Sequence, residues 1–388
     1  MFNNQQNYKD REYQVAFNYF AKIGPINLRR LESYFSNLSE AFWANSFDLT
    51  KAGINSKIIS EFLVWRNSFC LEKALEDLSN EQINFVTWHD ETYPQILKEI
   101  FVPPPILYFK GLLNGKGSSI EVNNLAVVGS RKHSTYAEKV ISELLPPLIK
   151  NNITIVSGLA LGVDSLAHQT ALKNRGITLA VLGSGLSTNY IYPRSNFRLA
   201  QEIIESGGAL ISEFPPKTPP LKQNFPQRNR IISGLSQATL VIESKEKSGS
   251  LITANFALEQ NREVAAIPGN IFSEFSAGPN NLISKGAKLI KSSEDILEIF
   301  QIEMSVKTPQ EFKVKKNDIK NKHNYKGENT TETLIYQLLL EAQERAEKIT
   351  ADEIIKKSKL DTAIINSTLS ILEIKGLVKN DETGYYLN

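Results

Sequence analysis

The fold class follows from a short segment that reads Leu125-Ala126-Val127-Val128-Gly129-Ser130-Arg131. Its apolar half runs directly into small and polar residues, as expected for a strand that is buried on both faces of a parallel sheet. Helical stretches separate this segment from similar runs further along the chain. Further strands are expected at 153–156, 178–182, 209–211, 239–242 and 264–267. The alternation predicts βαβ units and an α/β fold with a parallel sheet.

Small or polar residues follow every one of these expected strands. Because the carboxyl ends of parallel strands meet at one edge of the sheet, ligands bind outside that edge. We therefore expect the strand tips to line one crevice. The tips are Gly129-Ser130-Arg131, Ser157-Gly158, Gly183-Ser184-Gly185, Ser212-Glu213, Glu243-Ser244 and Pro268-Gly269-Asn270.

The segments on either side of the expected sheet have a different pattern. Before it, apolar residues recur every three or four positions from about Tyr13 to Lys98, which predicts helices. After it comes a polar, lysine-rich stretch, and then helical periodicity returns with a capping box at Thr350 and Glu353 and a terminal hairpin. We expect a helical domain over 1–104, the sheet domain over 105–300, a linker over 301–330 and a winged-helix-like domain over 331–388.

Composition and charge narrow the class of protein. The 388 residues are 41% apolar and 22% charged, which is ordinary for a globular protein. The 44 basic and 42 acidic residues nearly cancel, so any affinity for nucleic acid has to come from a local patch. Cys70 is the only cysteine, which fits a reducing compartment, and no apolar run is long enough to span a membrane. We expect a cytoplasmic protein with no membrane segment.

The turn after the first expected strand suits a bound anion. Gly129 lets the chain approach a ligand closely, and Arg131, after Ser130, supplies a permanent forked charge. Thr135 and Glu138 predict a capping box on the next helix, whose amino end favours an anion. A plain turn with a surface arginine is the alternative, because the dinucleotide fingerprint G-x-G-x-x-G is absent.

The strongest local feature lies between Lys217 and Arg230, where there is no acidic residue. Basic groups that follow phosphates, with Phe225 offering a face for a base, are what single-stranded nucleic acid requires. A solvated basic loop with Phe225 buried beneath it is the alternative. Lys222 and Arg228 are its other basic residues, and Asn224, Gln227 and Asn229 add donors and acceptors for base edges. A second anion nest is expected at Lys245-Glu246-Lys247-Ser248-Gly249-Ser250.

Residues for covalent chemistry are scarcer. The four histidines show no spacing typical of a metal site, and the nucleophile motif G-x-S-x-G is absent. We expect Glu213 and Glu243 to orient Arg131, Arg228 or Arg230 through charge-assisted hydrogen bonds. The sequence therefore predicts a binding protein that is not an enzyme and has no cofactor or metal.

Several short motifs together resemble the DprA/Smf family of DNA-processing proteins. Their order and spacing cover roughly residues 105–295, and F-P-x-R-N-R followed by S-G-S-L-I-T-A is highly specific. The motifs are Val128-Gly129-Ser130-Arg131, Ser157 to Asp164 with Ala167-His168, Tyr192-Pro193, Ser212-Glu213, Phe225 to Ile232, Ser248 to Ala254, Pro268-Gly269 and Gly278 to Ile283.

The resemblance implies an extended Rossmann-like domain that binds single-stranded DNA. It also implies an N-terminal helical domain of the SAM or helix-hairpin-helix type and a C-terminal winged-helix-like domain. The implied role is in natural transformation and recombination, where a homodimer formed through the Rossmann-like domain protects incoming single strands and loads the RecA recombinase on them. The implied DNA-binding residues are Gly129, Ser130, Arg131, Ser157, Gly158, Lys222, Asn224, Phe225, Arg228, Asn229, Arg230, Ser248, Gly249 and Ser250.

Two other functions stay open at this point. Related Rossmann-like phosphoribohydrolases cleave nucleotides, but the segment nearest their motif P-G-G-x-G-T-x-x-E lacks the glycines and has Phe256 in place of the glutamate. A scaffold for partner proteins would show no salt-sensitive affinity for DNA. The segment 331–388 carries more acidic than basic residues, so we expect it to contact protein or the rest of the molecule.

Overall fold

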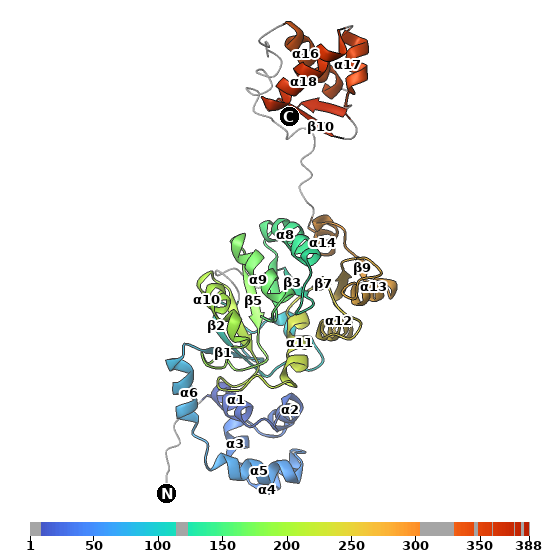
Figure 1. Cartoon of the computed structure of the whole chain (residues 1–388). Coiled ribbons are helices and arrows are strands. Elements are labelled where there is room, and N and C mark those ends of the chain that lie inside the picture. Colours follow the sequence, from blue (N-terminus) through green and yellow to red (C-terminus); the bar gives the residue numbers. More distant parts are fainter. Residues whose placement is uncertain are drawn as a thin grey trace. The chain divides into compact units, whose positions relative to one another are not determined.

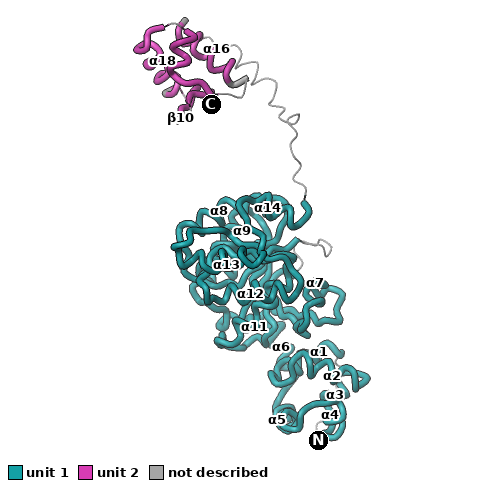
Figure 2. The backbone as a smooth tube through the Cα atoms, turned by 90° about the vertical axis from the view of Figure 1, so that its right-hand side faces the viewer, with its two compact units in different colours: residues 1–304 teal, residues 305–388 magenta. Residues whose placement is uncertain are grey.

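The computed structural model describes residues 9–113, 123–302, 330–344, 348–358, 360–375, 377–381 and 384–387. The chain forms two compact units, residues 1–304 and 305–388 (Figure 2). The expected linker, 301–330, lies almost entirely outside the described residues. None of the described helices is long and apolar enough to cross a membrane.

A nine-stranded sheet forms the centre of the first unit (Figure 1). Its strand order is β1-β2-β6-β5-β4-β3-β7-β8-β9, in which the strands from β3 to β9 run parallel and β1 and β2 form an antiparallel edge. The strands are β1 Asn84–Thr87, β2 Ile106–Gly111, β3 Asn124–Val128, β4 Thr154–Ser157, β5 Thr178–Val181, β6 Ala209–Ser212, β7 Ala238–Val241, β8 Glu263–Ala266 and β9 Lys288–Leu289. The predicted α/β fold with a Rossmann-like sheet is confirmed.

The order of the strands reverses between β3 and β7. From β3 the chain adds β4, β5 and β6 on one side, and it then returns to add β7, β8 and β9 on the other. The two strands at the reversal are paired in parallel, with Val128 opposite Val241 at their carboxyl ends. Open α/β sheets bind ligands at such a reversal, because the connections diverge there and leave a crevice.

Helices cover both faces of the sheet (Figure 1). One face carries α8 Thr135–Lys150, α9 Val163–Lys173, α10 Phe197–Glu205 and α14 Ser293–Ile299. The other carries α11 Asn224–Gly234, α12 Gly249–Glu259 and α13 Ala277–Ser284. Two apolar cores result. Leu125 and Val127 of β3 point into the first core, and Ala126 and Val128 point into the second, as the alternation of side chains along a strand requires.

The N-terminal part of the first unit is helical, as expected. It contains α1 Asp10–Tyr19, α2 Pro25–Tyr34, α3 Leu38–Trp43, α4 Ser46–Lys51, α5 Ser56–Arg66 and α6 Leu71–Asn80. Aromatic rings fill its core. The ring of Phe17 lies 5.7 Å from that of Phe42 and 5.6 Å from that of Phe62. Such aromatic pairs stabilise the packing beyond the apolar area that they bury.

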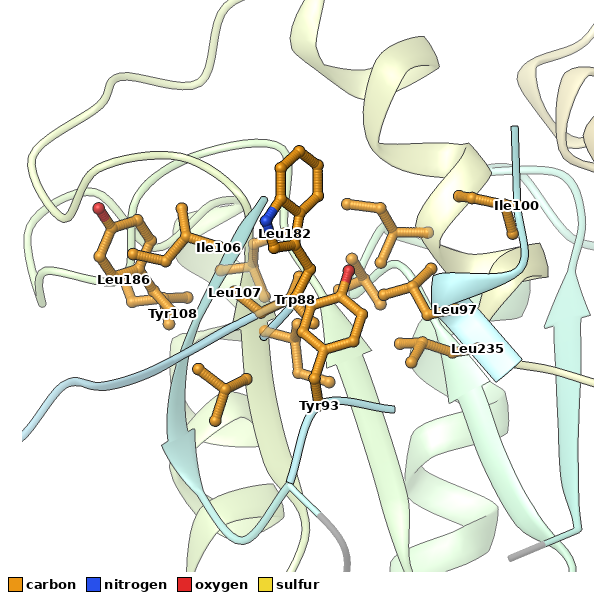
Figure 3. Packing of buried hydrophobic residues seen from close by; sticks show 14 of the residues in the cluster. Trp88, Tyr93, Leu97, Ile100, Ile106, Leu107, Tyr108, Leu182, Leu186 and Leu235 are labelled. Carbon is orange, nitrogen blue, oxygen red and sulfur yellow. The ribbon is translucent and has the colours of Figure 1, made fainter. Parts of the chain in front are cut away.

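The helical prediction for Tyr13 to Lys98 is wrong at Asn84–Thr87, which is strand β1. Its partner is β2, about 20 residues further on, so local periodicity does not reveal the pairing. The segment between the two strands, which includes the short helix α7 Gln95–Lys98, packs into the sheet core (Figure 3). Tyr93 is fully buried there and donates a hydrogen bond to the carbonyl of Pro104 at 2.8 Å.

The second unit has its own apolar core. Its described elements are α16 Thr330–Glu344, α17 Ala351–Ser358, α18 Thr362–Ile374, β10 Val378–Asp381 and β11 Gly384–Leu387. The predicted capping box is confirmed, since the Thr350 amide donates to Glu353 Oε2 at 3.0 Å and the Glu353 amide donates to Thr350 Oγ1 at 3.4 Å. The predicted hairpin is confirmed as well. The winged-helix assignment stays a prediction.

Candidate nucleic-acid interface

A cleft of about 710 Å³ opens at the carboxyl ends of β3 and β7, where the strand order reverses. The turn after β3, the segment after β7 and the first half of α11 form its walls. Most of the predicted DNA-binding residues line it: Gly129, Ser130, Arg131, Lys222, Phe225, Arg228, Asn229, Ser248, Gly249 and Ser250. The predicted crevice therefore exists, although only some of the strand tips reach it.

The turn that carries Arg131 is held in place by the start of α9. The Val163 amide donates to the carbonyl of Ser130 at 3.1 Å, and a Cβ atom on Gly129 would lie 2.6 Å from Val163 Cγ2. Gly162 has a φ of +80°, and a Cβ there would lie 2.3 Å from the Ser130 carbonyl oxygen. Side chains at these glycines would separate the turn from the helix. The backbone of the turn is thus fixed, while the Arg131 side chain extends into solvent.

The start of α8 differs from the prediction. The expected capping box of Thr135 and Glu138 is wrong, because Ser134 is the N-cap and Glu138 Oε1 lies 2.8 Å from His133 Nε2. Glu243, at the end of β7, accepts hydrogen bonds from the Ser134 amide, at 3.0 Å, and from the Ser134 hydroxyl. A carboxylate from a neighbouring strand therefore does what the third helical residue does in a capping box. Glu243 therefore orients this cap, and the prediction that it orients an arginine is wrong.

The aromatic surface of the cleft comes from two parts of the chain. Phe225 lies in the first turn of α11, so the part of the expected basic loop that begins at Asn224 is a helix. Its ring packs against Gly183, where a Cβ would lie 2.9 Å away, and the Arg131 guanidinium carbon lies 5.6 Å from the ring centroid. The ring of Tyr192, 46% exposed, is 5.8 Å from the Phe225 ring. The Arg131 guanidinium therefore lies next to a pair of aromatic rings in the cleft.

Arg228 lines the cleft but is buried in its floor, with only 4% of the residue exposed. Its guanidinium donates to the carbonyl of Gly158 at 2.8 Å, to the carbonyl of Val181, and to Asn229 Oδ1 at 3.1 Å. Burial lowers its pKa to about 10, and the Asp164 charge opposes that shift. Three of its five N–H donors are used within the fold, so Arg228 holds the floor together, and Arg131 is the exposed arginine of the cleft.

Four predicted residues do not line the cleft, and their role in binding DNA stays a prediction. Ser157 is fully buried and donates to the Val127 carbonyl at 2.6 Å, and a Cβ at Gly158 would lie 2.7 Å from the Arg228 guanidinium. Asn224 is buried at the start of α11. Arg230 forms an ion pair with Glu213, as we had predicted for that carboxylate, on another side of α11 from the cleft. These side chains are used within the fold.

The sequence did not single out several cleft residues. Lys245 and Lys247 lie in the anion nest recognised from the sequence, but no role was given to them. Tyr192 comes from the connection between β5 and α10; the motif Tyr192-Pro193 contributes to the family resemblance, but no role at the site was given to this ring. Asp164 accepts hydrogen bonds from the amides of Gly158, at 3.1 Å, and Ala160, at 3.4 Å. Burial raises the pKa of Asp164, although the Arg228 charge opposes that rise.

The exposed charges of the cleft are mostly positive. Arg131, Lys222, Lys245 and Lys247 are exposed, and Asp164 is the acidic residue among the lining residues described. Lys217 belongs to the same basic stretch but points elsewhere, since its amine lies 2.7 Å from Asp77 of α6. A phosphate chain would therefore be attracted along the cleft.

Comparisons with known proteins cover most of the first unit. Residues 84–301 match the family model of DNA recombination-mediator protein A, from β1 to the end of α14. Protein Smf of Synechocystis is 37% identical over 289 residues, which are 74% of this chain and 72% of that protein. The crystal structure of DNA processing protein A from Streptococcus pneumoniae has a TM-score of 0.62 at 33% identity, covering 75% of this chain and 98% of that one. A structure that describes the single-stranded DNA binding mode of DNA processing protein A from Helicobacter pylori has a TM-score of 0.50 at 29% identity, covering 57% of this chain and 97% of that one.

Proposed function

The chain belongs to the DNA recombination-mediator protein A family, and from this premise we propose that it binds single-stranded DNA in the cleft at the β3–β7 reversal. In this proposal Arg131 and Lys222 bind phosphates, and Phe225 stacks a base. The amides around Ser248 and Gly249, at the start of α12, add an anion site. The strand is held by its backbone and by its base faces, which explains how binding can tolerate any sequence.

One observation carries the proposal: a free arginine, Arg131, lies 5.6 Å from the ring of Phe225 inside an otherwise basic cleft. Inside a duplex both faces of a base are covered by the neighbouring base pairs, whereas a single strand can offer a base face to Phe225, so a ring beside a cation should favour single strands over duplex DNA. The Helicobacter pylori relative, whose single-stranded DNA binding mode has been described, supports the same ligand class.

Replacing Arg131 or Lys222 with alanine should weaken binding most at low salt. Each phosphate contact releases counterions, so the loss of one contact should reduce the slope of log affinity against log salt by about 0.7. Fluorescence anisotropy of a labelled oligothymidylate at several salt concentrations measures the slope. Lys217→Ala is the matched control, because it removes the same charge from the same stretch but outside the cleft. An equal effect of all three substitutions would mean that only bulk charge matters.

We also propose that the protein binds DNA without changing it covalently. Glu213 and Glu243, the carboxylates at the ends of two strands, are occupied by Arg230 and Ser134. Asp164 is held by backbone amides below the cleft surface. End-labelled DNA and nucleoside monophosphates should therefore be recovered intact after incubation with the protein. Release of a free base that Glu243→Gln abolishes would favour the phosphoribohydrolase alternative instead.

The proposed role in the cell follows the family resemblance. We propose that the protein protects incoming single strands during natural transformation and loads the RecA recombinase on them, acting as a homodimer through the Rossmann-like domain. Addition of the protein should shorten the lag before RecA hydrolyses ATP on a strand coated with single-strand-binding protein. Arg131→Ala should lengthen that lag again. A lag that the protein leaves unchanged would limit its role to protection.

A further inference from the structure

Another exposed aromatic residue lies on the loop that follows β8. Phe272 is 89% exposed and its neighbour Ile271 is 80% exposed, and we call these two residues the apolar tip. Most bulky apolar side chains of the sheet domain are covered, so two adjacent exposed ones suggest an interaction site. No part of the proposed function so far uses them.

The loop that carries the apolar tip is joined to the cleft wall. The Ser244 amide donates to the Phe275 carbonyl at 2.7 Å, and the Gly278 amide donates to the Ser244 carbonyl at 2.9 Å. Lys245, which lines the cleft, forms an ion pair with Glu274, and its amine lies 5.7 Å from the Phe275 ring centroid. The loop is therefore continuous with the β7 side of the cleft.

The same loop also reaches the β3 side. The hydroxyl of Tyr136, in the first turn of α8, donates to the Pro268 carbonyl at 2.8 Å. The side chain of Asn280 bonds both the amide and the carbonyl of Gly269, at 3.2 and 3.0 Å, and Asn270 Oδ1 accepts from the Phe272 amide at 2.9 Å. These bonds fix the loop, so the apolar tip is presented by an ordered backbone. A preformed platform loses little conformational entropy when a ligand stacks on it.

We infer that the apolar tip extends the DNA site: a single strand that leaves the cleft past Lys245 stacks a base on Phe272. The inference rests on the proposed function, because the occupant is the same strand. Lys245 supports it, since this exposed cation contacts the loop that presents Phe272: its amine pairs with Glu274 and lies 5.7 Å from the Phe275 ring centroid. A cation and an aromatic face on one loop are the combination that binds a nucleotide. Glu274 holds the Lys245 amine in the free protein, and a phosphate would take its place.

The test compares oligothymidylates of increasing length on the full chain. Phe272→Ala should leave the affinity for the shortest bound oligomers unchanged and should lower it about five- to hundredfold once the strand is long enough to reach the loop. Phe272→Trp should keep the affinity for long oligomers, and Phe272→Leu should lower it as Phe272→Ala does, because stacking needs an aromatic face. Phe101→Ala is the matched control, since Phe101 is 92% exposed and does not line the cleft.

Two further measurements separate this inference from its alternatives. A 2-aminopurine base moved along the strand should be quenched at one position beyond the cleft, and Phe272→Ala should remove the quenching there alone. Glu274→Gln should tighten binding of the long oligomers several-fold, because a competing carboxylate is lost.

The inference is overturned if Phe272→Ala has no effect at any length while Phe225→Leu and Arg131→Ala still weaken binding, an outcome that leaves the proposed function intact. It is also overturned if Phe272→Ala leaves DNA affinity unchanged and only lowers the oligomeric mass measured by sedimentation, which would indicate that the apolar tip contacts a second copy of the chain.

Discussion

Replacing Arg228 with methionine should lower the free energy of unfolding by about 3 to 5 kcal/mol. This is the usual cost of removing one member of a buried charged interaction while its partners stay buried. The substitution leaves the carbonyls of Gly158 and Val181 without their donor. Unfolding in urea, followed by the fluorescence of the three tryptophans, all of which lie in the first unit, measures the loss. Arg131→Met is the matched control, because that exposed arginine should change stability by less than about 0.5 kcal/mol while weakening DNA binding.

The loss from Arg228→Met should also depend on pH through Asp164. Burial raises the pKa of Asp164, and the charge of Arg228 opposes that rise, so the substitution should raise this pKa further. When the folded-state pKa of Asp164 lies above its unfolded-state value of about 4, the free energy of unfolding falls as the pH rises from the lower of these two pKa values to the higher. Adding Asp164→Asn should therefore recover more stability at pH 8 than at pH 5. Equal recovery at both pH values would contradict the coupling of these two residues.

Replacing Phe225 with leucine should weaken binding of single-stranded DNA by about 1 to 3 kcal/mol, the usual contribution of one stacked base. Leucine still fills the space against Gly183 but offers no aromatic face, so the salt slope and the melting temperature should stay close to those of the wild type. Titrations at several salt concentrations, together with thermal denaturation, check all of these quantities. Phe225→Tyr should retain the affinity.

The neighbouring ring provides an independent check on stacking. Tyr192 lies 5.8 Å from Phe225 and is 46% exposed, so it can receive the next base along the strand. Tyr192→Phe should keep the affinity, while Tyr192→Leu should lower it. If Phe225→Leu instead lowers the melting temperature and spares DNA binding, Phe225 is a packing residue of α11 and the base must stack elsewhere.

The sequence by itself predicted the central strands, because a strand that is buried on both faces must be apolar throughout. Residues 125–128 show this, and every strand expected from such a run is present in the sheet. The antiparallel edge was not predicted. β1 has the residues Asn84–Thr87 and mixed burial, and it becomes a strand only because β2 lies beside it. Strand formation of this kind depends on a remote partner, and local periodicity does not contain that partner.

The candidate site shows the same division. The motifs identified residues that surround the cleft, but the strand order decided which segments meet there: the turn after β3 and the segment that follows the tip of β7 do. Ser157 and Ser212 are buried, and each donates a hydrogen bond to a carbonyl of a neighbouring segment.

Arg228 and Arg230 look alike in the sequence, yet they are separated by about 200° around α11. One therefore faces the cleft floor and the other faces Glu213. A residue type and its spacing determine what chemistry is available. Only tertiary packing decides which polar groups are used within the fold and which stay free for a ligand, because the partners come from distant parts of the chain.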